Sequence, residues 1–297
     1  MVSRRSFLTA AAASVAAAAV VRPSVGAAQS SANKQFAKLP LRMGVQPGFF
    51  EGTMAEQMQA IADWGFPGYE YMWPDADKVA ESRALAEKLG LESTCIGGVG
   101  AIAPGNMVDK SKHDDMEKMF RKNVQMAKDI NTKRLIGLSG NTDPNKSIDE
   151  QTENVVICLK RLAPIAEENG VTIIMEALNP LVDHKGYFLT RTDQTMDILE
   201  KVGSPNVKML FDIYHQQITE GNVIRNLSQN IDRIGHFHVA DNPGRKQPGS
   251  GELNYTNIFK AIVATKYDGF VSLECGKTGT VDEALNSVLS FFDEVKA

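Results

Sequence analysis

Residues 207–215 read VKMLFDIYH, an apolar run that closes on an acidic residue, Asp212. A carboxylate at the end of a buried strand needs a partner, because burying it unpaired costs several kcal/mol. The same pattern recurs and gives Glu176 (TIIMEALNP, 172–180), His238 (GHFHVAD, 235–241) and Glu274 (VSLEC, 271–275). The intervals of 36, 26 and 36 residues are each close to one β–α unit, so these segments predict strands of one parallel sheet.

From Leu41 onward, short apolar runs alternate with amphipathic segments of helical period. The predicted strands are Arg42–Gln46, Gly68–Met72, Glu92–Ile96, Arg134–Leu138, Thr172–Glu176, Val207–Asp212, Gly235–Ala240 and Phe270–Glu274. The predicted helices include Thr53–Trp64, Asp77–Leu89, Lys112–Asp129, Gln151–Asn169, Asp193–Val202 and Thr280–Val295, with helix ends marked by Gly90 and Gly170. Eight strands in about 257 residues match the size of a (β/α)8 barrel, typically ~250 residues.

An open, doubly wound sheet is the alternative arrangement of such units, and it would need a phosphate-binding glycine motif. The only candidate is Gly98–Ala103, and Pro104 follows where a helix should begin. A pyrophosphate would therefore meet no helix dipole. We predict an α/β fold with a single TIM barrel over residues 41–297.

The N-terminus has the composition of an export signal. The pair Arg4 and Arg5 precedes an apolar stretch over residues 10–21, and Gly26 and Ala28 suit a cleavage site. This arrangement resembles a Tat signal peptide, and its apolar stretch is too short to span a bilayer of roughly 30 Å. We predict a Tat-type signal peptide over residues 1–28, a disordered leader over 29–40, and periplasmic export without membrane attachment after cleavage.

The charge balance argues against nucleic-acid partners. The chain has 32 Lys and Arg against 36 Asp and Glu, a net charge of −4. Removing residues 1–28, which hold three arginines and no acid, leaves 29 against 36, or −7. Phosphate backbones bind clustered basic residues, so we expect no nucleic-acid partner. The three cysteines are too few for a disulfide framework, and we expect Cys95 and Cys158 to be buried and Cys275 to point away from the barrel interior.

The C-terminal ends of barrel strands meet at one mouth. Three carboxylates and one imidazole would repel there without a cation, so Glu176, Asp212, His238 and Glu274 are predicted to bind one divalent metal ion. Oxygen-rich ligation suits Mn²⁺ or Mg²⁺, with Co²⁺ as a substitute. Taken singly, each carboxylate would more often be a loop cap or ion-pair partner. His236 shares a face with His238 and either supports it or fills the barrel.

Four motifs resemble those of hydroxypyruvate isomerases in the xylose isomerase-like barrel superfamily: DIYHxQ (212–217), GHxxxAD (235–241), PGR (243–245) and PGxGExNY (248–255). The resemblance extends to EALNP (176–180) and YDGFVSLE (267–274) and covers most of the barrel. It implies that Glu176, Asp212, His238 and Glu274 are metal ligands, that Glu176 and Glu274 are also the catalytic acid/base pair, and that His215 and Arg245 bind substrate. One position departs: hydroxypyruvate isomerases have Gln where this chain has His238, whereas ketose 3-epimerases of the superfamily have His.

The resemblance implies a divalent-metal-dependent aldose–ketose isomerase that acts through an enediolate on a small sugar or hydroxy-oxo acid. The alternatives are a ketose 3-epimerase, an exported sugar lyase or hydrolase, and a non-catalytic sugar-binding protein, which would not need the paired glutamates. A homo-oligomer is compatible with the sequence. His184 and Trp73, in loops after strands, are further candidates for substrate contact. Phe49 and Phe50 are candidates for a pocket wall or for core, and His113 is expected to be solvated.

Overall fold

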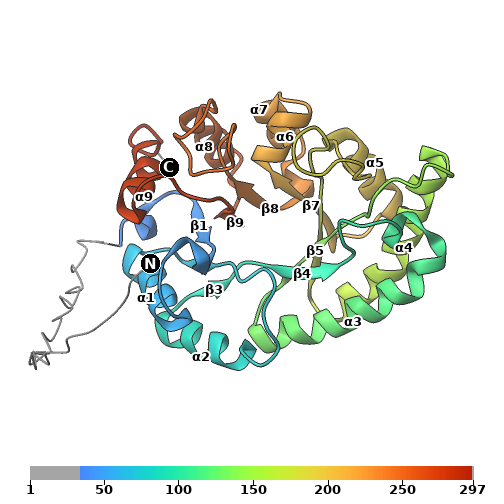
Figure 1. Ribbon diagram of the computed structural model, residues 1–297, viewed down its shortest axis with the longest axis horizontal. Helices are drawn as coiled ribbons and strands as arrows, with labels where there is room; N and C mark the ends of the chain where they lie inside the picture. Colours follow the sequence, from blue (N-terminus) through green and yellow to red (C-terminus); the bar gives the residue numbers. More distant parts are fainter. Residues whose placement is uncertain (1–33, 296–297) are drawn as a thin grey trace, which may run out of the picture. The chain divides into compact units, whose positions relative to one another are not determined.

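Every strand of the computed structural model, which describes residues 34–295, runs parallel to its neighbours. The strands are β1 (Arg42–Val45), β2 (Gly68–Tyr69), β3 (Glu92–Ser93), β4 (Ile96–Val99), β5 (Arg134–Gly137), β6 (Thr172–Glu176), β7 (Val207–Asp212), β8 (Ile234–Val239) and β9 (Phe270–Leu273). Their order in the sheet is β3-β2-β1-β9-β8-β7-β6-β5-β4. The two outer strands of this order are consecutive in the chain, so the sheet curls into a nearly closed barrel with helices around it (Figure 1). The predicted barrel is confirmed.

The third predicted strand, Glu92–Ile96, is interrupted. Thr94 and Cys95 separate β3, which pairs with β2, from β4, which pairs with β5. Two backbone hydrogen bonds keep the broken strand against its neighbour, from Thr94 N to Tyr69 O (2.9 Å) and from Gly97 N to Met72 O (2.7 Å). The eight predicted barrel positions therefore remain, and one of them is divided in two.

The helices lie between successive strands and cover the outside of the barrel (Figure 1). They are α1 (Met54–Trp64), α2 (Val79–Leu89), α3 (His113–Ile130), α4 (Ile148–Glu168), α5 (Thr192–Val202), α6 (Ile213–Thr219), α7 (Val223–Gln229), α8 (Tyr255–Ala264) and α9 (Val281–Ser290). Thr53 and Glu56 form a capping box at the start of α1, and Gly90 ends α2 in the left-handed conformation, as predicted. Helices α6, α7 and α8 add to those predicted.

The segment just before β1 is ordered. Residues Phe36–Lys38 form a 3-10 helix, and the Phe36 ring is buried, stacked on Phe66 with ring centroids 3.9 Å apart and edge-on to Trp64. The expectation of a disordered leader is therefore wrong for its described part, residues 34–40, because Phe36 closes this side of the core. The predicted signal peptide, residues 1–28, lies outside the described residues.

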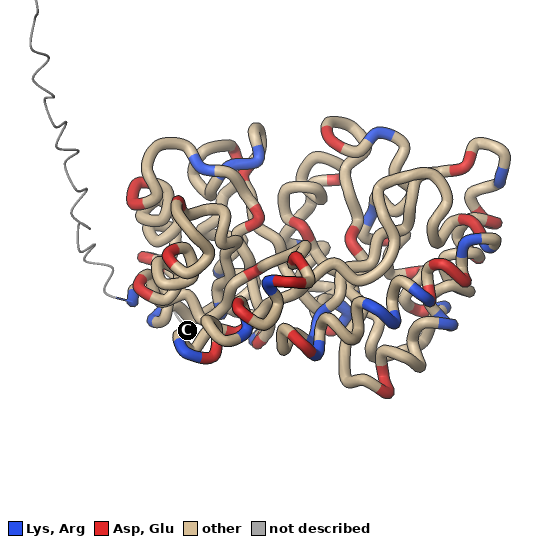
Figure 2. The backbone as a smooth tube through the Cα atoms, turned by 60° about the horizontal axis from the view of Figure 1, so that its bottom comes forward, with Lys and Arg blue, Asp and Glu red and all other residues tan. Residues whose placement is uncertain are grey.

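Acidic and basic residues are interspersed along the helices and loops of the backbone (Figure 2). Over residues 34–295, no helix combines the length and the apolar composition that a membrane span requires.

Candidate active site

Four neighbouring strands, β6 to β9, bring the predicted ligands together. Glu176 ends β6, Asp212 ends β7, His238 lies near the end of β8, and Glu274 directly follows β9. One ligand atom from each residue lies within 4.8 Å of the others. We call these four residues the strand-end cluster. Its first three members are buried, and Glu274 is slightly exposed to the barrel mouth.

Asp212 divides its two carboxylate oxygens between structure and site. Oδ1 accepts hydrogen bonds from the backbone N–H groups of Tyr214 (2.8 Å) and His215 (3.2 Å), and so caps helix α6. Oδ2 is buried and makes no hydrogen bond within the described residues. Asp212 therefore does cap a helix, but the cap uses only Oδ1, and Oδ2 remains for the cluster.

The two ring nitrogens of His238 contact different groups. Its Nδ1 lies 3.1 Å from Glu274 Oε2 and 3.4 Å from Glu176 Oε1, inside the strand-end cluster. Its Nε2 lies on the opposite side of the ring, 3.0 Å from Oε1 of a fifth acidic residue, Glu70. Burial disfavours a charged imidazole, but the charges of Glu70 and Glu274 hold the pKa of His238 well above its usual range.

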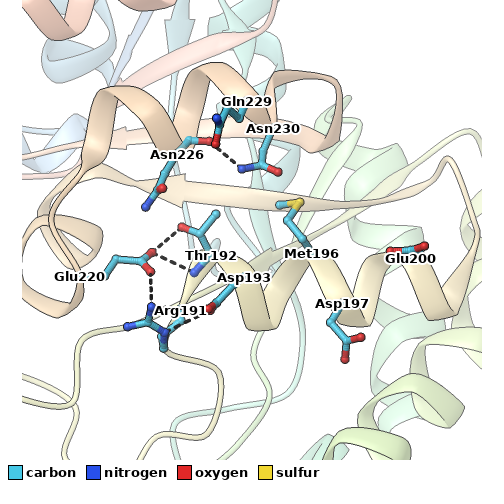
Figure 3. Close-up of a pocket in the computed structure, with 10 residues that line it drawn as sticks. All are labelled: Arg191, Thr192, Asp193, Met196, Asp197, Glu200, Glu220, Asn226, Gln229 and Asn230. Atoms are coloured by element: carbon cyan, nitrogen blue, oxygen red, sulfur yellow. Dashed lines mark hydrogen bonds and ion pairs between the residues drawn. The ribbon is translucent and has the colours of Figure 1, made fainter.

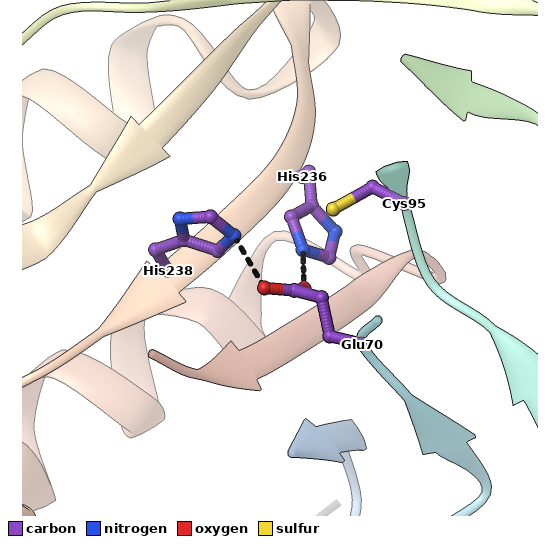
Figure 4. Close-up of side chains that lie close together, drawn as sticks. All are labelled: Glu70, Cys95, His236 and His238. Atoms are coloured by element: carbon purple, nitrogen blue, oxygen red, sulfur yellow. Dashed lines mark hydrogen bonds and ion pairs between the residues drawn. The ribbon is translucent and has the colours of Figure 1, made fainter. Parts of the chain in front are cut away.

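Glu70, directly after β2, is the residue that sequence reasoning missed. It is buried, and its Oε2 lies 3.0 Å from His236 Nε2 (Figure 4). The same oxygen accepts a 2.8 Å hydrogen bond from Thr94 Oγ1. Although burial opposes its ionisation, the charge of His238 and hydrogen bonds from both imidazoles hold the pKa of Glu70 well below its usual range. A glutamate within a predicted strand, Gly68–Met72, was the available signal. His236 thus supports the site through Glu70.

The two glutamates of the predicted acid/base pair have different environments. Burial raises the pKa of Glu176 to about 7, although His238 opposes the shift. Glu274 is also buried, but the charges of His238 and Arg245 lower its pKa to about 2. At neutral pH one carboxyl therefore holds a proton readily while the other is ionised, which is the pairing that proton transfer requires.

Arg245 extends over the cluster from the loop after β8. Its Nη2 donates a 2.7 Å hydrogen bond to Glu274 Oε2 and lies 3.6 Å from Asp212 Oδ2, and its guanidinium lies over the Tyr214 ring. Asp241, an acidic residue close to Arg245 in the sequence, instead accepts hydrogen bonds from backbone N–H groups of the same loop. The loop after β8 therefore places the positively charged guanidinium of Arg245 beside the strand-end cluster.

His215 and His184 lie next to each other, beside the strand-end cluster. The buried His215 Nδ1 accepts hydrogen bonds from Asn179 N (3.3 Å) and Nδ2 (2.7 Å), so its Nε2 carries the proton and points toward Asp212 Oδ2, 3.6 Å away. Burial lowers the pKa of His215, so the ring is a neutral donor. The half-buried His184 ring lies with its centroid 5.2 Å from that of His215.

Trp73 borders a cleft of about 440 Å³ that reaches the cluster at Glu274 and also includes Glu70. The indole is 59% exposed. A Cβ built on Gly97 would fall 1.8 Å from the indole, so the ring lies directly on the Gly97 backbone. Trp73 thus has one supported face and open surface beside the site, whereas Phe49 and Phe50 are buried in the core.

Three other sequence expectations concern residues outside the cluster. The expectation that His113 is solvated is wrong: the ring is buried, and its Nε2 lies 3.0 Å from Met107 O. Cys95 and Cys158 are buried as expected, and Cys275 is partly exposed. Cys95 lies beside His236 and Glu70 (Figure 4).

A cleft of about 480 Å³ lies away from these residues, between α5 and α7 (Figure 3). Glu220 there accepts a hydrogen bond from Thr192 N and pairs with Arg191, so its carboxylate is already engaged. No member of the strand-end cluster lines this cleft.

The strand-end cluster fits a divalent ion. It combines three carboxylates with one imidazole, and two buried atoms facing it, Asp212 Oδ2 and His238 Nδ1, make no hydrogen bond of good geometry within the described residues. Buried polar atoms are rarely left in this state unless another group satisfies them. Hard oxygen ligands with one nitrogen match Mn²⁺ or Mg²⁺.

The family model described as xylose isomerase-like TIM barrel matches residues 58–294. Hydroxypyruvate isomerase of Escherichia coli is 29% identical over 80% of this chain and 93% of its own length. A 2-oxo-tetronate isomerase of Cupriavidus necator is 31% identical over 75% of this chain and 87% of its own length.

Solved structures share the fold. An AP endonuclease of family 2 from Brucella melitensis superposes with a TM-score of 0.75 and 23% identity over 86% of this chain and all of that one. The 3-keto-D-glucoside 4-epimerase of E. coli superposes with a TM-score of 0.71 and 24% identity over 84% of this chain and 98% of that one. The IolI protein, solved with a bound zinc atom, gives 0.70 and 16% identity over 86% and 98%.

Proposed function

The chain belongs to the xylose isomerase-like TIM barrel family, and on that premise we propose that it is a hydroxypyruvate isomerase-like enzyme dependent on one divalent metal ion. The observation that carries the proposal is the strand-end cluster. In it, two glutamates whose pKa values are shifted in opposite directions lie beside an aspartate and a histidine. The substrate class is a small sugar or hydroxy-oxo acid.

Glu176, Asp212, His238 and Glu274 would hold the ion. When bound, a divalent ion supplies Lewis-acid stabilisation of the negative charge that develops on a substrate oxygen during enolisation. Asp212 Oδ2 and His238 Nδ1, which face the cluster without a hydrogen bond of good geometry within the described residues, support this assignment.

The two glutamates move the proton. An ionised carboxylate removes a proton from the carbon beside the carbonyl, and an enediolate results. A protonated carboxyl then returns a proton to the former carbonyl carbon, and the proton of the original hydroxyl passes to the former carbonyl oxygen, so that carbonyl and hydroxyl exchange positions. The opposite pKa shifts of Glu176 and Glu274 support their use as this pair.

Arg245, His215 and His184 bind and orient the substrate in this proposal. The guanidinium of Arg245 is suited to a carboxylate or to several hydroxyl oxygens, and substrate would take over part of its contact with Glu274. The neutral His215 donates from Nε2 beside Asp212. Together these groups fix which face of the substrate meets the glutamates.

A second candidate function is a ketose or keto-glycoside epimerase. His238 at the third ligand position supports it, and so does the cleft beside Trp73, because an exposed aromatic face suits a sugar ring more than a three-carbon acid. An epimerase would return the proton to the opposite face of the same carbon.

A substrate panel distinguishes the two functions. Protein expressed without residues 1–28 and loaded with Mn²⁺ would be incubated with hydroxypyruvate, free ketoses and a 3-keto-glucoside, and the products identified by ¹³C NMR. Movement of the carbonyl supports the isomerase, and inversion at one carbon supports the epimerase. No turnover with Mn²⁺, Mg²⁺ or Co²⁺ would refute both.

We also propose export by the Tat pathway, which rests on Arg4, Arg5 and the apolar stretch that follows them. Replacement of both arginines by lysine should leave the full-length chain in the cytoplasm, as cell fractionation would show. Unchanged periplasmic recovery would refute the proposal.

A further inference from the structure

A buried acidic residue outside the strand-end cluster contacts its histidine. Glu70 Oε1 lies 3.0 Å from His238 Nε2, and neither side chain is exposed to solvent. The contact is on the side of the imidazole ring opposite the cluster, where Nδ1 lies 3.1 Å from Glu274. An imidazole whose Nε2–H donates to a carboxylate presents its Nδ1 lone pair to a cation.

The other oxygen of Glu70 is held in place from two sides. Oε2 faces His236 Nε2 at 3.0 Å (Figure 4). It also accepts a hydrogen bond from Thr94 Oγ1 (2.8 Å). Thr94 is itself confined: a Cβ added at Gly44 or Gly68 would fall 2.8 or 2.7 Å from its methyl carbon. The carboxylate is therefore held in place, with Oε1 in ion-pair contact with His238 Nε2.

We infer that Glu70 is a positioning residue, which fixes the ring and tautomer of His238 so that Nδ1 is the atom that binds the metal ion. The inference rests on the proposed metal dependence. Partners of this kind, behind a ligating histidine, typically change metal affinity by about 10- to 100-fold when they are replaced.

The same side chains could instead hold an ion of their own. Glu70, Cys95, His236 and His238 each offer one ligand atom within 4.8 Å of the rest. However, Oε2 of Glu70 already has two donors, Thr94 and His236, which occupy both of its lone pairs. Oε1 makes no hydrogen bond of good geometry within the described residues but faces His238 Nε2 at 3.0 Å, so we take Glu70 as a support for His238 rather than as a ligand of a second metal ion.

The test is the Mn²⁺ dissociation constant of Glu70→Gln, measured by titration calorimetry on metal-free protein. We expect binding about 10- to 100-fold weaker than wild type, because the Gln amide places a donor against His238 and favours the proton on Nδ1. The Co²⁺ absorption bands should shift as well. Glu81→Gln, which removes an exposed glutamate on α2, is the matched control and should bind as wild type does.

Thr94→Val keeps the shape of its side chain and removes the hydroxyl that orients Glu70, so it serves as a second variant if Glu70→Gln does not fold. It should weaken Mn²⁺ binding several-fold.

Three results would overturn the inference. Wild-type affinity and an unchanged Co²⁺ spectrum in a folded Glu70→Gln or Thr94→Val would refute the positioning role alone. Two Co²⁺ ions per chain, with a thiolate charge-transfer band that Cys95→Ser abolishes, would make the cluster a second metal site. Wild-type protein that binds no divalent ion would refute the proposed metal dependence as well.

Discussion

Asp212 is the clearest case of one residue serving both fold and site, because Oδ1 caps α6 and Oδ2 faces the cluster. Asn is as good an N-cap as Asp, but it lacks the anionic second oxygen. Asp212→Asn should therefore weaken Mn²⁺ binding at least about tenfold, while its urea unfolding midpoint stays close to that of the wild-type protein.

Asp212→Ala is the comparison for that prediction, because it removes the cap as well as the ligand. It should lose about 1 kcal/mol more stability than Asp212→Asn. Equal stability of the two variants would show that the cap contributes nothing, and undiminished Mn²⁺ affinity in either would remove Asp212 from the ligand set.

The protonation of the cluster predicts how metal affinity depends on pH. Burial raises the pKa of Glu176 to about 7, and a ligand carboxyl must lose its proton to bind a cation. Lowering the pH through 7 should therefore weaken Mn²⁺ binding, with a slope that approaches about tenfold per pH unit for the one proton displaced from Glu176. Calorimetry in buffers of different ionisation enthalpy would count the protons released. An affinity independent of pH between about 5.5 and 8 would contradict the assignment of Glu176.

At the scale of elements, the junction of β4 and β5 depends on a glycine. Gly100 has φ +84°, and a Cβ there would fall 1.9 Å from the backbone oxygen of Leu138. Gly100→Ala should lower the free energy of unfolding, measured in urea, by about 3 kcal/mol, because relieving the clash requires a shift of the backbone at Gly100 or at Leu138. Gly170→Ala, at φ +63° with open space around it, is the control and should cost about 1 kcal/mol. Equal losses would contradict the clash.

Strand and helix positions were predictable where the pattern is local. The strand ends at Glu176 and Asp212 and the helix stop at Gly90 follow from apolar runs and turn residues nearby in the sequence. The break in the third strand does not, because it depends on which neighbour each half pairs with. Glu70 was missed for the same reason: its partner His236 is 166 residues away in the chain.

At the scale of the whole molecule, the segment before β1 belongs to the folded body. Phe36 is buried and stacked on Phe66. Phe36→Ala should lower the free energy of unfolding by about 3 kcal/mol, because it leaves a cavity beside Trp64. Lys38→Ala, an exposed change in the same segment, should have almost no effect. Equal stability of the two variants in urea would contradict the packing.

The family, the barrel and the convergence of four strand ends all followed from repeated sequence motifs. The ordered structure of residues 34–40 did not, since a lone Phe36 in a polar segment carries no periodic signal. Neither did the division of roles within the cluster, because it depends on the burial of Glu176 and on the contacts of Glu274 with His238 and Arg245, which form only in the fold.

The central claim is that Glu176 and Glu274 enolise a substrate with the help of a divalent ion. Solvent-deuterium incorporation, followed by NMR in D₂O with the best substrate of the panel, tests it most directly. The account predicts exchange at carbon with Mn²⁺-loaded wild type, loss of about 10²- to 10⁴-fold in Glu176→Gln and in Glu274→Gln, and recovery of wild-type exchange on adding Mn²⁺ after chelation. Turnover without deuterium incorporation, or full exchange in either variant, would contradict it.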